Sequence, residues 1–567
     1  MGINIVKKAL RAFKKYGVTL PYEYAKWKLG RKRFWLYAKE LEDRKYANLE
    51  LQQKTIDGLY DPEQLAGDCT RIMAGERRIL FFEDPNTKFL DPKYQWEKDR
   101  MQHLYPLAIL ISKTGKQETI DYFKHEICCY ANDDHCNNTN AMEIAIASIN
   151  LLVSYQTAKL EDAKTNELIK QEIKKNLIYI LQNIEKGLEL SNNHYFFDLL
   201  GVLWITDEVE QDRLIQHLHE YAEKEMKKLL VQIISHDGSL YEGSTYYTRY
   251  VTEALCEYVY YHPSKANQYS ALLQRMLSFL QGIACNGLIV GIGDNDSGRV
   301  LPIGQYFSYR SRSIQRIMEL NQLLRINVKI QANVANYQDM GLLVLKREAC
   351  IVYLRCDTIS NRRRNRLLGG HEHNDQLSVQ LTVGEEPIIV DPGTYLYISQ
   401  NNCRINNMRT KSHSTFFIEG LEQNTITNDW NYKERDAVAK VNYIDEQKIS
   451  ATVCYKDVLH NRTVTVGNHH IEIIDQIQTN HNGALSFVMA PSLRLVSIEE
   501  NKAIFFSENL EVAIEADARI MIRRSFYSEE YGMREETIKL EIGVKSSAHT
   551  NVTWKEKRKT SKCRREA

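Results

Sequence analysis

The spacing of hydrophobic residues divides the chain into two parts. Between about residues 100 and 330, apolar residues recur at the three-to-four-residue spacing of amphipathic helices, as in DRLIQHLHEYAEKEMKKLLVQII (212–234). Further helices are expected at 141–157, 168–184, 246–261 and 266–284. Successive helices joined by short polar turns predict stacked helical hairpins.

From about residue 340 the pattern changes to short, often alternating runs that are typical of strands. Examples are QLSVQLTVGEEPIIVD, KISATVCYKDVLHNRTVTV and AIFFSENLEVAIEA, which turns rich in Gly, Asn, Asp and Glu separate. Many strands in series predict a sandwich or barrel. We therefore expect a basic N-terminal region (1–60), a helical domain (61–335), an all-β domain (336–555) and a basic tail (556–567), with a substrate cleft between the two large domains.

The N-terminal region has the pattern of a short basic amphipathic helix. Ile3, Val6, Leu10 and Phe13 recur at helical spacing among lysines and an arginine. Such a helix can lie on an anionic membrane surface, or it can pack on its own domain with a solvated basic face. No run resembles a signal peptide or a spanning helix, so we expect a cytoplasmic protein or one at the membrane surface, with the periplasm or cell envelope as the alternative.

Composition excludes some functions and leaves others open. The 567 residues include 74 Lys and Arg against 73 Asp and Glu, so there is no overall positive field to hold nucleic acid. The eleven cysteines have no regular spacing and predict no disulfide framework. The 33 tyrosines are about twice the average share; their flat faces with a polar edge suit sugar rings, although half-buried strands use them as well.

Four segments concentrate polar residues: SNNHYFFDLLGVLW (191–204), DGSLYEGSTYYTRY (237–250), GIGDNDSGR (291–299), and the region from HEHND (371–375) to His413. In the first, Asn192 and Asn193 can start a helix as N-cap residues or, with His194, face an anionic ligand group. In the second, a tyrosine would need a cationic or hydrogen-bonded environment to ionise, since its reference pKa is about 10. The third lacks the ligands of an EF-hand and is expected to be a turn or a cleft loop.

The fourth segment is a candidate metal site. His373, Asp391 and His413 offer two imidazoles and a carboxylate, a set that suits zinc with water in a fourth position. His371 lies two residues from His373; in an extended backbone both would point the same way, whereas in a tight loop they would diverge. The alternative interpretation is that these residues only satisfy hydrogen bonds of loops.

Six motifs in order, NNH, DGSLYEGSTYYTRY, GDNDSGR, GGHEHNDQLS, IIVDPGTYLY and RTKSHSTFFIEG, resemble the heparinase II/III-like polysaccharide lyases, a group that includes related alginate lyases. The resemblance spans about residues 100–520. It implies an incomplete toroid of α-helical hairpins followed by an antiparallel β-sandwich. It also implies β-elimination at a 4-linked uronic acid of an acidic polysaccharide.

The resemblance implies roles for particular residues. Asn193, with His194 beside it, would neutralise the substrate carboxylate; Tyr247 would protonate the leaving oxygen and can also act as base; His371 would be the base or the ionisation partner of Tyr247. A structural zinc ion would be held by His373, Asp391 and His413. Residues expected to bind substrate are Asn192, Glu242, Arg249, Arg299, Arg404 and Arg409.

The sequence departs from the pattern of the family at two places, and two other functions are possible. Glu372 stands between the histidines where a small residue is expected, and the arginines at 362–364 and 366 can grip sulfates or carboxylates. A silent carbohydrate-binding or polysaccharide-assembly protein would use the same scaffold. A weaker alternative is a hydrolase with Glu242 and Asp294 as its carboxylate pair.

Overall fold

The computed structural model describes residues 20–43, 60–78, 91–133, 139–188, 191–329, 333–347, 349–357, 370–397, 402–428, 431–434 and 436–557. The predicted N-terminal helix from Ile3 to Phe13, the arginines at 362–366 and the basic tail from residue 558 lie outside these ranges. The described helices include none that is long and apolar enough to cross a membrane.

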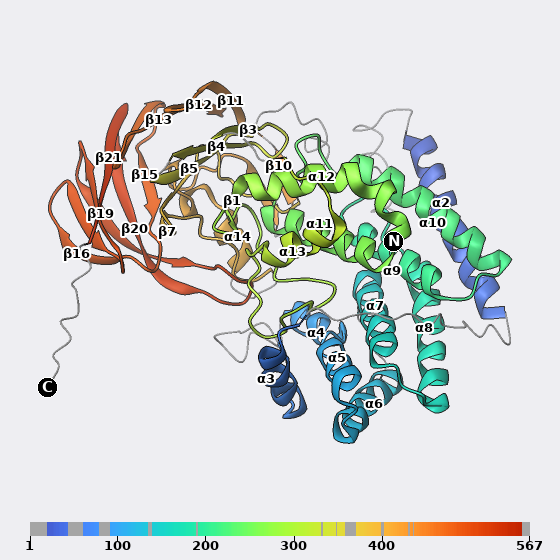
Figure 1. Cartoon of the computed structure of the whole chain (residues 1–567). Helices are drawn as coiled ribbons and strands as arrows, with labels where there is room; N and C mark the ends of the chain where they lie inside the picture. The colour runs from blue at the N-terminus through green and yellow to red at the C-terminus, as the bar shows by residue number, and fades with distance from the viewer. Residues whose placement is uncertain are drawn as a thin grey trace, which may run out of the picture.

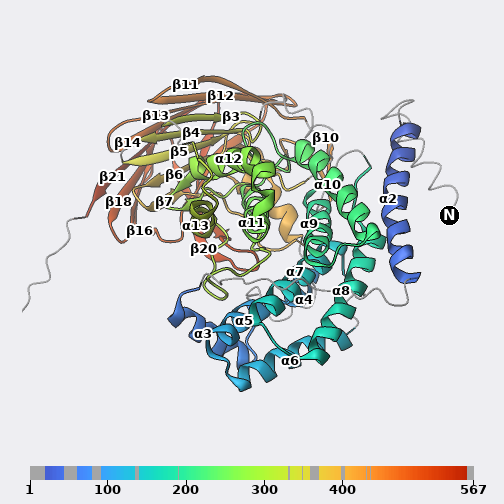
Figure 2. The same ribbon diagram turned by 45° about the vertical axis from the view of Figure 1, so that its right-hand side comes forward.

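The first half of the chain is an arc of helical hairpins (Figure 1 and Figure 2). Its helices are α2 (Leu20–Asp43), α3 (Pro62–Met73), α4 (Pro92–Asp99), α5 (Leu104–Thr114), α6 (Gln117–Asn132), α7 (Ala141–Ala158), α8 (Ala163–Asn183), α9 (Asn193–Glu208), α10 (Arg213–Ile233), α11 (Thr245–Tyr261), η3 (Pro263–Lys265), α12 (Ala266–Ile283) and α13 (Gln315–Leu324). α5 packs on α7, α7 on α9, and α9 on α10. The helices expected from periodicity between residues 141 and 284 are all present.

Two layers of helices follow from the hydrophobic pattern. Every residue of α7 is buried, as are nearly all residues of α9, because these helices are apolar on all sides. α8 and α10 bury one stripe and expose the other. Gly201 of α9 lets the inner helices approach closely, since a Cβ atom there would lie 2.5 Å from the Cβ of Ala145 in α7.

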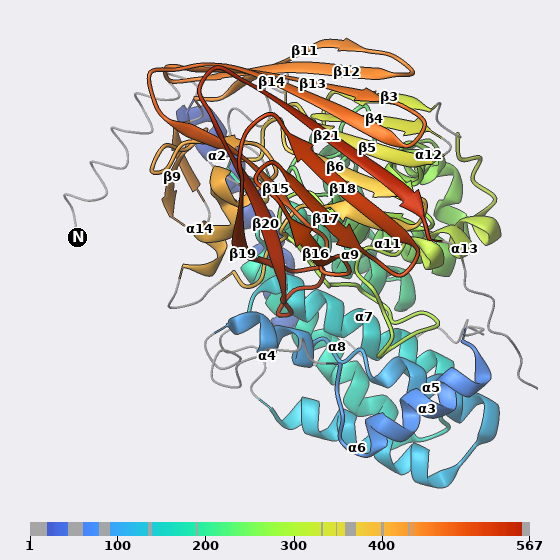
Figure 3. The ribbon, with the colours of Figure 1, turned by 90° about the vertical axis from the view of Figure 1, so that its left-hand side faces the viewer.

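The second half consists of antiparallel sheets (Figure 3). A five-stranded sheet has the order β3 (Val334–Tyr337), β4 (Leu342–Arg347), β5 (Cys350–Arg355), β6 (Val379–Val383), β7 (Glu386–Ile389). An eight-stranded sheet has the order β11 (Val438–Ile444), β12 (Lys448–Tyr455), β13 (Val458–Val466), β14 (His470–Gln478), β21 (Ser547–Glu556), β18 (Leu510–Ala516), β17 (Lys502–Phe506), β16 (Arg494–Ile498). A four-stranded sheet has the order β19 (Ile520–Tyr527), β20 (Glu535–Val544), β15 (Gly483–Val488), β8 (Phe416–Phe417).

Short elements connect these parts. Two hairpins, β1 (Ala284–Cys285) with β2 (Leu288–Ile289) and β9 (Thr425–Asn428) with β10 (Asn431–Glu434), and the helices α14 (Cys403–Met408) and η5 (Thr410–Ser412) lie between the larger elements.

The five-stranded sheet joins the two halves of the molecule. Along β4, Leu342 and Val344 belong to the hydrophobic core of the helices, whereas Leu343 and Leu345 belong to the core of the β domain. This division follows from the period of two in a strand, which sends successive side chains to opposite faces. The predicted helical domain followed by an antiparallel β-sandwich is confirmed, and the change from helix to sheet falls between Leu324 and Val334.

Candidate active site

A cavity of about 480 Å³ opens between the helical domain and loops of the β domain. Helix α4 and the N-terminal turns of α7, α9 and α11 form one side of it, and the loops around His371 and Tyr397 form the other. Six of the residues singled out from the sequence line this cavity: Asn192, Asn193, His194, Glu242, Tyr247 and His371. Segments separated by up to 179 positions in the chain thus meet at one site.

Backbone hydrogen bonds hold the loops of the site together. The His371 amide donates to the Glu242 carbonyl oxygen at 3.0 Å, and the Asp294 amide donates to the His371 carbonyl oxygen at 2.9 Å. Gly293 is required between them, because its φ is +72° and a Cβ atom would lie 2.3 Å from the His371 carbonyl oxygen. The glycine in the GDNDSGR segment therefore fixes the position of His371.

Glu242 orients Asn193 at the start of α9. The Asn193 side-chain amide donates to Glu242 Oε2 at 2.7 Å, and its backbone amide donates to Oε1 at 2.9 Å. The carboxylate also lies at the positive end of the helix dipole. With its nitrogen turned to Glu242, Asn193 keeps Oδ1 without a protein partner among the described residues. Asn192 occupies the N-cap position, but its side chain makes no capping hydrogen bond and remains exposed.

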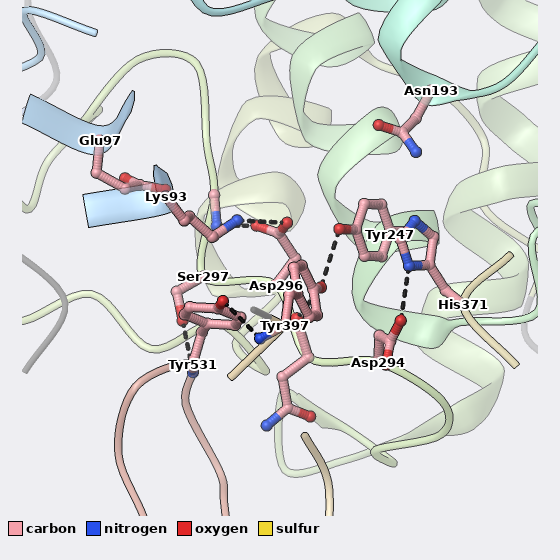
Figure 4. A network of polar contacts seen from close by, with 12 residues as sticks. Lys93, Glu97, Asn193, Tyr247, Asp294, Asp296, Ser297, His371, Tyr397 and Tyr531 are labelled. Atoms are coloured by element: carbon pink, nitrogen blue, oxygen red, sulfur yellow. Dashed lines mark hydrogen bonds and ion pairs between the residues drawn. The ribbon is translucent and has the colours of Figure 1, made fainter. Parts of the chain in front are cut away.

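Tyr247 and His371 form a stacked pair. Their ring centroids lie 3.6 Å apart with an interplanar angle of 11°, and the Tyr247 hydroxyl lies 2.9 Å from the hydroxyl of Tyr397. Figure 4 shows Asn193 pointing from α9 toward this pair. Burial, reinforced by the Asp296 carboxylate, raises the pKa of Tyr247 well above its ordinary value. The phenol is therefore protonated at neutral pH and can donate a proton.

Asp294 is the centre of the polar network behind the pair. It accepts hydrogen bonds from His371 Nδ1 at 2.8 Å, from Thr394 at 2.9 Å and from Arg404 Nε at 3.0 Å, and it lies 3.0 Å from His373 Nε2. Burial favours the neutral acid, but the Arg404 guanidinium and the histidine hydrogen bonds outweigh it, so the pKa of Asp294 lies well below its ordinary value. For His371, burial disfavours the imidazolium, yet hydrogen bonds to Asp294 and Glu242 outweigh it and raise the pKa.

His194 stands at the edge of the cavity with its side chain about one-third exposed. Its Nδ1 lies 3.0 Å from Glu185 Oε1. Burial disfavours the imidazolium, but the Glu185 hydrogen bond and the charges of Glu185, Glu143 and Glu242 outweigh it and raise the pKa of His194.

Sequence reasoning missed the cavity residues on α4; Asp296, the partner of Lys93, lies in the GDNDSGR segment, which was expected to be a turn or a cleft loop and does line the cavity. Lys93 Nζ lies 2.7 Å from Asp296 Oδ2, and Arg100 is bonded to Glu143 (Figure 4 for Lys93). The region around α4 carried no polar motif, and only the contact with Asp296, 203 positions away, reveals its role. Tyr397 was also missed, although its motif IIVDPGTYLY had been noted.

The arginines expected to bind substrate lie elsewhere. Arg249, Arg299 and Arg404 are fully buried and do not line the cavity. Arg249 donates to the Gly298 carbonyl oxygen at 2.7 Å, Arg299 to the Tyr306 carbonyl oxygen at 3.0 Å, and Arg404 holds Asp294. Arg409 is half-buried and also lies outside the cavity wall. The expectation is corrected for Arg249, Arg299 and Arg404, because their guanidinium groups hold the loops of the site.

The three predicted metal ligands gather in a buried group. One donor atom of each of His373, Asp391 and His413 lies within 4.8 Å of the others. His373 Nδ1 and His413 Nε2 are buried and have no protein partner among the described residues, while His413 Nδ1 lies 2.8 Å from Asp391. Two imidazoles with unpartnered nitrogens beside a carboxylate fit a zinc ion.

The chain has the fold of solved polysaccharide lyases that join a helical toroid to a β-sandwich. Residues 329–555 match the family model of the heparinase II/III-like C-terminal domain. The chain thus carries a heparinase II/III-like C-terminal domain, and the resemblance seen in its motifs is confirmed.

Solved structures share this fold at low sequence identity. A crystal structure of heparinase III superposes with a TM-score of 0.67 at 14% identity, covering 95% of this chain and 92% of that one. The heparan sulfate lyase HepC from Pedobacter heparinus gives 0.56 at 12%, covering 94% and 89%. The chondroitin AC lyase of Streptomyces coelicolor A3, in complex with chondroitin sulphate, gives 0.53 at 10%, covering 94% and 83%. No curated protein matches by sequence.

Proposed function

We propose that the protein is a lyase that cleaves a uronic-acid-containing polysaccharide by β-elimination. The observation that carries the proposal is the convergence of Asn193, Tyr247 and His371 on one cavity wall, with the tyrosine stacked on the histidine. These are the residue types that the three tasks of the reaction need: a partner for the carboxyl group, a proton acceptor and a proton donor. The solved structures named above support a polysaccharide as the substrate class.

Asn193 is proposed to act on the C6 carboxyl group of the substrate. The C5 proton is poorly acidic while that carboxyl group is ionised, so the enzyme must neutralise its charge. The unpartnered Oδ1 of Asn193 can only accept a hydrogen bond, and an acceptor favours the protonated form of a carboxyl group that faces it. Glu242 maintains this orientation, because it accepts from the amide nitrogen.

The Tyr247–His371 pair is proposed to move the protons. His371, with Nδ1 donating to Asp294, accepts the C5 proton at Nε2 in its neutral form; the electron pair of the C5–H bond forms the double bond between C4 and C5, and the bond from C4 to O4 breaks. Tyr247, protonated in its buried site, donates to the departing O4. The Tyr397 hydroxyl donates to the Asn295 carbonyl oxygen at 2.5 Å, so it accepts from Tyr247 and holds the phenol in place until substrate arrives.

We also propose that His373, Asp391 and His413 hold a zinc ion. The unpartnered nitrogens of the two histidines support this proposal. When bound, the ion would supply positive charge that fixes the loop; elimination requires no activated water. His371 lies two residues from His373 of this group and faces the cavity. In this proposal His373 binds the metal that supports the loop, and His371 takes part in the reaction.

The charges of the cavity favour a substrate of low charge density. Lys93 is paired with Asp296, and Arg100 with Glu97 and Glu143, so the lysine and the arginine among the described residues of the wall are already neutralised. Densely sulfated polymers need unpaired cationic partners. We therefore propose an unsulfated or lightly sulfated uronate polymer as the preferred substrate.

Absorbance of the unsaturated uronate tests the reaction. Purified protein is incubated with heparan sulfate, heparin, chondroitin, alginate and bacterial capsular polysaccharides, and reducing ends are counted in parallel. The proposal predicts that absorbance and reducing ends rise together, and more strongly with heparan sulfate than with heparin. Reducing ends without absorbance would indicate a hydrolase; Asp294 argues against that alternative, because it is fully buried, ion-paired to Arg404 and outside the cavity wall. Binding without either product would indicate the silent carbohydrate-binding protein.

A further inference from the structure

Helix α2 lies on the outer side of the helical domain (Figure 2). It packs on α8, and Phe34, Ala38 and Leu41 form its buried stripe. Trp27 Nε1 donates to the Lys186 carbonyl oxygen at 2.7 Å, which ties the helix to the loop that precedes α9. One face of α2 is thus anchored in the domain, and the opposite face is directed to solvent.

The outward face of α2 is unusually apolar. Leu29, Leu36, Tyr24 and Trp35 are 66%, 51%, 48% and 44% exposed. At about 100° per residue, Leu29 and Leu36 fall on one edge of this face, while Tyr24 and Trp35 fall together on the other edge. An aliphatic edge and an aromatic edge therefore flank the face.

Three lysines run between the two edges. Lys28, Lys32 and Lys39 are exposed and lie between the aromatic and the aliphatic side chains by the same helical geometry, and Lys39 also pairs with Glu42 at 2.6 Å. The surrounding sequence is also net positive: residues 1–43 contain eleven Lys and Arg and four acids, Glu23, Glu40, Glu42 and Asp43, of which the last three lie in the final turn of α2, whereas the remainder of the chain is net acidic. Positive charge is concentrated where the exposed apolar side chains lie.

We propose that the outward face of α2 binds the surface of an anionic lipid bilayer. Aromatic and aliphatic side chains would enter the interface, and the lysines would reach the headgroups with their aliphatic stems along the apolar region. Each juxtamembrane cation adds to such binding. Charge complementarity to an acidic surface and the composition of the two edges point to the same partner.

The same charges argue against other occupants of this face. Residues 1–19 contain five Lys and Arg and no acid, so they would place like charges on Lys28, Lys32 and Lys39. A second copy docked through α2 would bring lysine against lysine. A soluble polyanion would pair with the lysines but leave Leu29 and Leu36 in water.

Membrane binding would also place the cavity close to the bilayer. Lys186, which accepts from Trp27 through its carbonyl oxygen, is followed by Gly187, a residue of the cavity wall. The bound protein would thus hold its site beside polymer at that surface. The proposal itself concerns lipid and does not depend on catalytic activity.

Vesicle co-sedimentation of the full-length protein tests the inference. Vesicles of equal parts phosphatidylglycerol and phosphatidylcholine are compared with phosphatidylcholine alone. We expect binding to the anionic vesicles only, and a loss of about tenfold or more for the triple variant Leu29→Ser, Trp35→Ser and Leu36→Ser. The triple variant Lys28→Glu, Lys32→Glu and Lys39→Glu should lose binding as well.

A matched control separates this face from exposed apolar residues in general. Val496 and Ile498 of β16 are 48% and 43% exposed on the β domain, and the variant Val496→Ser, Ile498→Ser should bind vesicles like the wild type. All variants change exposed side chains, and circular dichroism verifies that they fold.

Four results would overturn the proposal. Undiminished binding by the serine triple variant would show that the exposed apolar side chains of α2 do not contact the bilayer. The contact would then lie outside α2 or would depend only on charge, as it would for a soluble polyanion. Equal binding to neutral vesicles would contradict the role of the lysines. Absence of vesicle binding by the wild type would contradict it directly. A dimer that the serine triple variant abolishes, with no binding to vesicles, would assign the face to a second copy of the chain.

Discussion

At the scale of single residues, the orientation of Asn193 depends on Glu242. Its carboxylate accepts from both the side chain and the backbone of Asn193, and this leaves Oδ1 for the substrate. We predict that Glu242→Gln lowers kcat by about 10- to 100-fold, because the amide loses its fixed orientation. Steady-state kinetics on the best polymer of the panel gives this value.

A double-mutant cycle distinguishes positioning from general destabilisation. If Glu242 acts through Asn193, the variant Asn193→Ala, Glu242→Gln should be no slower than Asn193→Ala alone. Asn192→Ala is the neighbouring control for the helix start and should keep kcat close to the wild-type value. Additive losses in the double variant would contradict the positioning role.

A second prediction at the scale of single residues concerns the protonation of His194. Its pKa is raised, because the Glu185 hydrogen bond and the charges of Glu185, Glu143 and Glu242 outweigh burial. The imidazolium therefore persists to higher pH than for an ordinary histidine. If it helps to bind an anionic substrate, as we propose, that help is lost as the pH rises through this raised pKa. We predict that KM rises over that interval and that Glu185→Gln moves the rise to lower pH. An unchanged KM profile in Glu185→Gln would contradict it.

The sequence predicted which residues lie in the site better than it predicted what each residue does there. Asn193, Tyr247 and His371 were recognisable because their motifs have an uncommon order. The buried arginines were misjudged, since a sequence shows charge but not burial, and Arg249 and Arg299 bind carbonyl oxygens of the chain instead of a ligand. Asp294 was underestimated for a related reason: its partners, among them His371 and Arg404, lie 77 to 110 positions away.

At the scale of elements, an ion pair fastens α4 to the GDNDSGR loop. Burial favours the neutral acid, but Lys93 and Arg100 outweigh it and lower the pKa of Asp296 to about 2. This depressed pKa contributes roughly 2 kcal/mol of stability above pH 4, which is lost as the pH falls from about 4 toward 2. We predict that Lys93→Met lowers the free energy of unfolding by about 3–5 kcal/mol at neutral pH, since Asp296 stays buried without its partner.

Denaturant unfolding at several pH values measures both effects. In Lys93→Met the acid-side loss of stability between pH 4 and 2 should become smaller, because Asp296 no longer has a strongly lowered pKa. Lys411→Met is the control, since its ion pair with Glu419 is exposed and should contribute at most about 1 kcal/mol. Equal, small effects of the two substitutions would show that α4 is not fastened in this way.

The metal site also acts between elements, because its ligands come from the loop before β6, the end of β7 and the residue after η5. We predict about one zinc ion per chain in protein purified without chelator, a lower Tm after chelation, and a return of Tm with added zinc. Elemental analysis and calorimetry measure these quantities. His413→Ala should lose the metal and the response to chelator. Metal-free protein whose Tm ignores both chelator and zinc would contradict the proposal.

Elements were predictable where the hydrophobic period is long and regular, as in α8, α10 and α12. The strands were recognisable as a series, but their arrangement was not. β21 pairs with both β14 and β18, and the sequence of the strand does not predict which strands it pairs with. β4 was visible as a short apolar run, whereas the assignment of Leu342 to the helical core and Leu343 to the β core depends on the packing of whole domains.

At the scale of the whole molecule, the cavity exists only where the domains meet. Asn193 and Tyr247 come from the helical domain, and His371 comes from the β domain, so neither half contains a complete site. The helix that we propose to bind membrane, α2, lies next to this cavity through the Lys186 loop. The arrangement predicts that the proposed activity requires both domains, packed against each other as they are in this structure.

The measurement that tests the central claim most directly compares two adjacent tyrosines by unsaturated-uronate absorbance. Tyr247 lines the cavity on the stacked face of His371, whereas Tyr246 is buried away from it, with its hydroxyl 3.4 Å from the Glu529 carbonyl oxygen. We predict that Tyr247→Phe lowers the rate of absorbance increase by at least about 100-fold, while Tyr246→Phe stays near the wild-type rate. Full activity in Tyr247→Phe would contradict the proposed elimination mechanism.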